Sequence, residues 1–165
     1  MRAVVNAIDR IFRGLLALLL AVMVACVTWQ VVSRYVLGSP SSWTEELARF
    51  LLIWIGLLGG AYAYHVKMHL GLDLLSQKLS PGARRVQARF IHAAVILFSV
   101  VVLLGGGLSL IGLSLELGQY SAALELPMWV VYLSLPLSGL MLVVYASLAL
   151  FEEPGRPSPA DGAAL

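Results

Sequence analysis

Long apolar runs separated by short polar links dominate the pattern of this chain. An apolar run of about 20 residues is long enough to cross a bilayer as a helix. On this pattern we expect transmembrane helices at about residues 14–35, 43–68, 90–115 and 127–151. The sequence therefore predicts an all-α integral membrane protein, with one four-helix domain over residues 1–151. The Pro/Gly/Ala-rich tail, residues 152–165, has the composition of a disordered segment.

The first run could also be a signal peptide, because it follows a basic, amphipathic lead-in over residues 1–13. The hydrophobic region of a signal peptide is usually about 7–15 residues long. Here the apolar character continues past Cys26 to Val32. We therefore interpret the run as a retained transmembrane helix and place the lead-in at the membrane surface.

The second run, residues 50–64, is short for a membrane span. At about 1.5 Å per residue it covers about 22 Å, less than a hydrocarbon core of about 30 Å. Flanking residues must extend this helix from Trp43 past His65. Ser42 and Glu45 fit a capping box at its start.

The ends of the helices carry further local signals. Glu45 and Arg49 are four residues apart and are expected to pair. Pro127 suits the first position of the fourth helix, and Pro136 is expected to kink that helix. Residues 69–89, between the second and third helices, have the mixed pattern of an amphipathic interfacial segment.

Lysine and arginine are unevenly distributed among the links. They occur before the first helix and between the second and third helices, at Arg2, Arg10, Arg13, Lys67, Lys78, Arg84, Arg85 and Arg89. The link between the first and second helices has only Arg34. Because positive charge favours the cytoplasmic side, we expect both termini and the middle link in the cytoplasm.

The composition supports this class and excludes others. Of 165 residues, 60% are hydrophobic and 12% are charged, whereas soluble domains average about 25% charged residues. No basic cluster is interleaved with aromatic residues, so nucleic acid is not an expected partner. The single cysteine, Cys26, excludes an intrachain disulfide. We predict no enzymatic activity and no cofactor.

Histidine spacing raises two alternatives. His65, His69 and Asp73 share one face of a continuous helix, as metal ligands would, but hydrogen bonding at the interface is the simpler interpretation. His65 and His92 lie at the same side of consecutive helices, and such a pair can ligate a haem in a helix bundle. The alternative function is therefore a haem-binding membrane anchor of a quinone-linked redox complex.

No predicted helix carries an acidic or basic residue at mid-depth, and only the fourth contains proline. Transporters that bind substrate themselves commonly use discontinuous helices at that depth. The pattern favours an accessory or scaffold subunit, surrounded by membrane lipids. Glu45, Glu46 and Arg49 lie in the first turns of their helix, where capping or the docking of another subunit would explain them.

Two motifs resemble the small membrane subunit (DctQ type) of TRAP transporters, the tripartite ATP-independent periplasmic family. They are RYVLGSPSSWTEELARFLLIWIGLLGGAYAYHVKMHLGLD and ELPMWVVYLSLPLSG. The matching residues are Arg34, Trp43, Glu45, Glu46, Arg49, Gly59, Gly60, His69, Asp73, Pro127, Trp129, Tyr132 and Pro136. The resemblance covers roughly residues 10–150. We treat these residues as candidate contacts with partner subunits.

The resemblance implies a multi-pass subunit of a bacterial inner membrane. Its partners would be a large permease subunit on a separate chain and a periplasmic binding protein. The complex would import organic acids, such as a dicarboxylate or sialic acid, by sodium symport. The large subunit would carry the substrate and sodium sites, and this chain would support it.

Overall fold

The computed structural model describes residues 2–67 and 81–151. Its helices are α1 (Arg2–Tyr35), α2 (Ser42–Lys67), α4 (Pro81–Phe98), the π-helix η1 (Ser99–Gly106), α5 (Gly107–Glu116), α6 (Met128–Tyr132) and α7 (Ser134–Phe151). Among these described residues, four segments are long and apolar enough to cross a membrane: Arg10–Tyr35, Ser42–Val66, Val86–Glu116 and Met128–Leu150. The predicted all-α membrane fold is confirmed.

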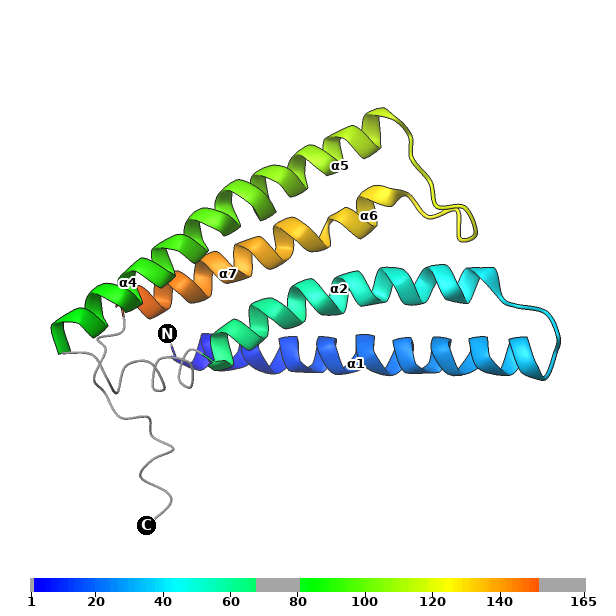
Figure 1. The fold of residues 1–165 in the computed structure, drawn as a ribbon, viewed down its shortest axis with the longest axis horizontal. Helices are drawn as coiled ribbons and strands as arrows, with labels where there is room; N and C mark the ends of the chain where they lie inside the picture. The colour runs from blue at the N-terminus through cyan, green and yellow to red at the C-terminus, as the bar shows by residue number, and fades with distance from the viewer. Residues whose placement is uncertain (1, 68–80, 152–165) are drawn as a thin grey trace, which may run out of the picture.

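The spanning segments lie side by side in a row. Helix α1 packs on α2, α2 packs on α7, and α7 packs on α4 and η1. Figure 1 shows two hairpins that converge at one end and separate toward the other. We call the separated end, which carries links 36–41 and 117–127, the loop end, and the opposite end the terminal end. A row leaves two broad faces on which apolar side chains are exposed.

The contact between α1 and α2 follows a heptad pattern. Most buried or half-buried positions on α1 recur at alternating spacings of four and three residues: Phe12, Leu16, Leu19, Met23, Cys26, Gln30 and Ser33. Leu15, beside this series, is also half-buried. In this heptad repeat, the same face of one helix stays in contact with its partner along the whole length of the pair. The main cluster of buried apolar residues forms where this pair meets α7, around Leu58, Ala61, Met141 and Tyr145.

The third and fourth spans approach closely because glycine takes the place of larger residues. A Cβ added at Gly107 would lie 2.8 Å from Pro136 Cδ, and one added at Gly139 would lie 2.8 Å from Leu103 Cβ. Ser99, Ser134 and Ser138 are fully buried in the same region. Small residues let backbones pack tightly where lipid gives no hydrophobic drive to helix association.

Several helix bounds differ from the predictions. Helix α1 begins at Arg2, so the predicted surface lead-in is a continuation of this helix. Its 34 residues span about 51 Å, longer than a hydrocarbon core of about 30 Å. Helix α4 begins at Pro81 rather than near residue 90, because proline is well accommodated in a first helical turn. The predictions for residues 68–80 and 152–165 lie outside the described residues.

The fourth span is broken, as its proline predicts. Helix α6 ends at Tyr132 and α7 begins at Ser134. Pro136 has no N–H to offer the Tyr132 carbonyl four residues earlier, so the hydrogen-bond ladder is interrupted at this turn. Pro127 is extended (ψ 127°) and is the N-cap of α6, whose first residue is Met128. The sequence pattern predicts Pro127 at the first helical position instead.

Candidate interaction surfaces

Glu46 ties the start of α2 to the distant link 117–127. Its carboxylate accepts hydrogen bonds from the backbone N–H groups of Ala122 at 3.1 Å, Ala123 at 2.9 Å and Leu124 at 2.8 Å. Successive N–H groups that converge in this way form a binding site for an anion. The carboxylate fills that site and so bridges the two hairpins at the loop end, where the link 117–127 reaches toward the start of α2 (Figure 1).

The link itself has an ordered backbone. Tyr120 and Pro127 form an isolated antiparallel bridge, and the Met128 N–H donates to the Gln119 carbonyl at 3.0 Å. Ser121 bonds Leu126 at both its N–H and its hydroxyl oxygen. Hydrogen bonds within the link 117–127 and from the link to Glu46 hold its backbone in one conformation. The exposed tip of the link therefore presents a fixed surface at the loop end.

The neighbouring charges of α2 are paired with each other. Arg49 Nη2 lies 3.2 Å from Glu45 Oε1, and both side chains are largely exposed, so the predicted pair is confirmed. The predicted capping box at Ser42 is replaced by a different arrangement. The Glu45 N–H donates to the Ser41 carbonyl, and the Thr44 hydroxyl donates to the same oxygen.

The glycines of α2 point in different directions. A Cβ added at Gly59 would lie 4.0 Å from Leu16 Cδ2, so Gly59 faces α1. A Cβ added at Gly56 or Gly60 would meet nothing within 4 Å, and both residues are exposed. Gly56 and Gly60 are four residues apart, the spacing by which small residues let a second helix approach in a membrane. This face of α2 is open in the described chain.

Aromatic contacts hold the terminal end together. The Tyr64 hydroxyl lies 2.6 Å from His92 Nδ1, which ties α2 to α4. The His65 ring stacks on Tyr145 of α7, with ring centroids 4.2 Å apart. Both histidines of the haem alternative therefore contact tyrosines of neighbouring helices. That alternative stays a prediction, which an absorbance spectrum tests.

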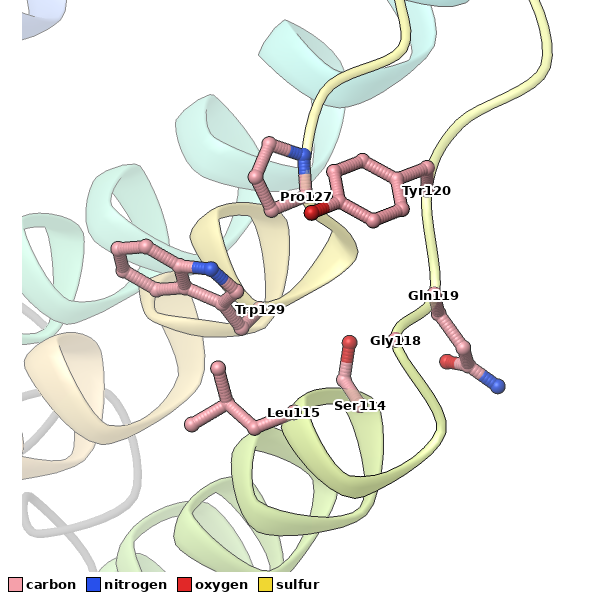
Figure 2. A pocket seen from close by; sticks show the side chains of 7 residues that line it. All are labelled: Ser114, Leu115, Gly118, Gln119, Tyr120, Pro127 and Trp129. Atoms are coloured by element: carbon pink, nitrogen blue, oxygen red, sulfur yellow. The ribbon is translucent and has the colours of Figure 1, made fainter.

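A small open pocket of about 70 Å³ lies between the end of α5 and the start of α6. Figure 2 shows the residues that line it: Ser114, Leu115, Gly118, Gln119, Tyr120, Pro127 and Trp129. Pro127 and Trp129, both sequence-predicted candidates, meet here.

The other predicted candidates are dispersed. Arg34 and Trp43 are exposed near the loop end, Tyr132 is half-buried, and Pro136 packs against Gly107. His69 and Asp73 lie outside the described residues. Within residues 2–67 and 81–151, no three His, Cys, Asp or Glu side chains gather as ligands for a metal ion.

Several of the interacting residues carry no recognisable signal in the sequence. Ser114 had no signal, because buried serines are common in membrane helices. Gly139 stands alone in an apolar stretch, and its contact with Leu103 depends on the register of two helices. The partners of Glu46 are backbone amides, which carry no side-chain signature.

Comparison with known proteins gives a consistent result. Residues 23–153 match the family described as tripartite ATP-independent periplasmic transporters, DctQ component. The sialic acid TRAP transporter small permease protein SiaQ of Vibrio cholerae is 32% identical over 149 residues, which cover 87% of this chain and 79% of that protein. The C4-dicarboxylate TRAP transporter small permease protein DctQ of Rhodobacter capsulatus is 33% identical over 113 residues, 65% of this chain and 47% of that protein.

A longer relative is also similar. The isethionate TRAP transporter permease protein DctMQ of Oleidesulfovibrio alaskensis is 32% identical over 124 residues. The match covers 71% of this chain but only 19% of that protein. In that relative, therefore, a segment similar to this chain is part of a much larger permease polypeptide.

Proposed function

Because this chain belongs to the DctQ family of TRAP-transporter small permease subunits, we propose that it is the static membrane scaffold of a sodium-coupled importer of organic acids. A larger permease subunit on a separate chain carries the substrate and sodium sites. The relatives named for sialic acid, C4-dicarboxylate and isethionate support an organic anion as the transported class. The chain itself is not an enzyme.

The arrangement of the spans in a row is the observation that carries this proposal. A closed four-helix bundle buries its contact faces against its own helices. Here the chain itself buries only 6% of the residues in the most apolar 18-residue stretch of the first span. In the corresponding stretch of the fourth span it buries 33%. One broad face is therefore available to the large subunit while lipid covers the other. Polar groups at both ends keep the row at a fixed depth in the membrane.

The open glycine face of α2 is the proposed seat for a helix of the large subunit. A Cβ added at Gly56 or Gly60 would meet no atom of the described residues within 4 Å, whereas one added at Gly59 would contact α1. A helix of the partner that packs on Gly56 and Gly60 gains backbone contact without displacing any residue of the described chain. The predicted interface residue Gly60 is thus retained, and Gly59 is reassigned to the packing of α1 on α2.

The loop end is the proposed contact for a periplasmic binding protein. The distribution of basic residues supports an orientation in which the termini face the cytoplasm of a bacterial cell and this chain lies in the inner membrane. The link clamped by Glu46 keeps one shape without a partner. A preformed surface reduces the ordering cost of docking.

Uptake and co-purification test the scaffold. Deletion of this chain should abolish sodium-driven uptake and lower the amount of large subunit in the membrane. Gly60→Leu should weaken co-purification of the large subunit, because the added side chain fills the proposed seat. Gly112→Leu is a matched control, since a Cβ at Gly112 on α5 would also meet nothing within 4 Å among the described residues. Unchanged uptake and unchanged large-subunit stability after deletion would refute the proposal.

A comparison of Gly59→Leu with Cys26→Ala separates internal packing from assembly. Both positions lie on the contact between α1 and α2. We expect Gly59→Leu to force the two helices apart and to weaken assembly indirectly, through a lower melting temperature of this chain. Cys26→Ala should have a smaller effect, because it removes only one buried sulfur atom.

A further inference from the structure

A buried hydroxyl lines the pocket at the loop end. Ser114 is 2% exposed, and its Oγ has no hydrogen-bond partner within residues 2–67 and 81–151. Figure 2 shows this oxygen directed toward Pro127 and Tyr120 across the pocket. A buried hydroxyl that bonds nothing costs free energy, so a ligand that accepts its hydrogen would be favoured here.

Ser109 and Ser134 of the same spans behave differently, whereas the Oγ of Ser99 on η1 also has no hydrogen-bond partner within the described residues but does not line the pocket. The hydroxyl of Ser109 donates to the Gly105 carbonyl at 2.9 Å, and that of Ser134 donates to the Val131 carbonyl at 2.7 Å. Bonding back to the preceding helical turn is the usual solution for serine in an apolar helix. Ser114 departs from it, although its own carbonyl accepts the Gln119 N–H at 3.1 Å.

The walls of the pocket are those of a headgroup-level site. Trp129 and Tyr120 are 36% and 66% exposed, and they lie where two apolar spans end. Tryptophan and tyrosine favour this depth of a membrane. Leu115, which lines the pocket, and Leu113, two residues earlier on α5, are exposed on a helix at the edge of the row. Acyl chains would therefore have apolar surface next to the pocket.

The charged residues near the pocket indicate which charge a ligand bound there should carry. Residues 90–151 contain no lysine or arginine, whereas Glu116 and Glu125 flank the pocket in sequence. At the same end, Arg49 is paired with Glu45, and no charged side chain lines the pocket itself, so no cation there would hold a ligand with net negative charge. Aromatic faces attract an ammonium group, and nearby carboxylates add to that attraction. The ligand should thus combine an oxygen acceptor for Ser114 with a cationic group.

We propose that this pocket binds the headgroup region of a zwitterionic phospholipid of the ethanolamine class, from the leaflet at the loop end. The Ser114 hydroxyl donates to a phosphate or ester oxygen. The rings of Trp129 and Tyr120 flank the ammonium group, and the exposed leucines of α5 contact an acyl chain. The site does not depend on the transported compound or on the large subunit.

Lipid titration of the purified full chain tests this site. The delipidated chain is titrated with phosphatidylethanolamine or phosphatidylglycerol of identical acyl chains, and bound lipid is counted by native mass spectrometry. Wild type should bind one phosphatidylethanolamine in preference to phosphatidylglycerol. Ser114→Ala and Trp129→Ala should each weaken this binding by about three- to tenfold. Ser109→Ala, on the same helix, should bind as wild type does.

Melting temperatures of the lipid-free variants establish that each variant is folded. Equal affinity of Ser114→Ala and wild type for phosphatidylethanolamine would overturn the proposal. Equal binding of phosphatidylglycerol would also overturn it, because the charge argument would then be wrong. If Ser114→Ala retained the lipid but lost co-purification of the large subunit, the pocket would be a protein contact, and the proposal would again be wrong.

Discussion

The three consecutive glycines of the third span give a sharp test of how this subunit is packed. Gly105, Gly106 and Gly107 are identical in sequence terms, but only Gly107 lies against the fourth span. A Cβ added at Gly107 would lie 2.9 Å from Leu135 Cβ as well as 2.8 Å from Pro136 Cδ. Neither neighbour is the free end of a flexible side chain. A Cβ added at Gly106 would meet nothing within 4 Å.

The expected effects of alanine at these positions have opposite signs. Overpacking a closely packed contact costs about 1–3 kcal/mol, so Gly107→Ala should be destabilising by that amount. Alanine at an open helical position gains about 0.5–1 kcal/mol over glycine, so Gly106→Ala should be neutral or slightly stabilising. For a chain of this size, 2 kcal/mol corresponds to about 4–8 °C in melting temperature.

The assay is thermal unfolding of the purified chain in one detergent, with wild type and both variants side by side. Gly107→Ala should melt several degrees below wild type, and Gly106→Ala at or above it. The variants differ by one position and have the same composition, so propensity and detergent effects cancel. Equal melting temperatures for the two variants would refute the packing of η1 and α5 on α7 that underlies the row of helices.

Three further outcomes follow from the contacts at the two ends. Glu46→Gln should accelerate hydrogen exchange at the amides of Ala122, Ala123 and Leu124, because a neutral amide is a weaker acceptor than a carboxylate. Glu45→Gln should leave the exchange rates of these amides unchanged. Equal exchange rates in the two variants would contradict the hydrogen bonds between Glu46 and the link. Tyr64→Phe should lower the melting temperature by about 2–4 °C, the effect of one hydrogen bond worth about 1 kcal/mol. Tyr62→Phe keeps the bond to His92 and should change little. The purified chain should show no Soret band, and its presence would favour the haem-anchor alternative.

The spans were predictable because membrane thickness imposes a length on apolar runs, whatever their packing. The break in the fourth span was predictable for a related reason, since Pro136 always removes one donor from the helix. The pairing of Glu45 with Arg49 depends only on helical spacing. Each of these features is set by residues close together in the sequence.

The remaining features depend on contacts between distant segments. Glu46 is a predicted contact with a partner, but its carboxylate accepts hydrogen bonds from a link more than 70 residues away in its own chain. It also grouped Gly59 with Gly60, although only their directions around α2 distinguish internal packing from an open face. Such assignments need the register and rotation of each helix, which periodicity leaves undetermined.

Site-directed cross-linking tests the scaffold role most directly. In a Cys26→Ala background, Gly60→Cys places a thiol on the open face of α2, and Leu20→Cys places one on the exposed side of α1. In membranes that contain the whole transporter, a bifunctional thiol reagent should join Gly60→Cys, and not Leu20→Cys, to cysteines introduced in the large subunit. Cross-links from Leu20→Cys alone, or from neither position, would contradict the proposed seat on α2.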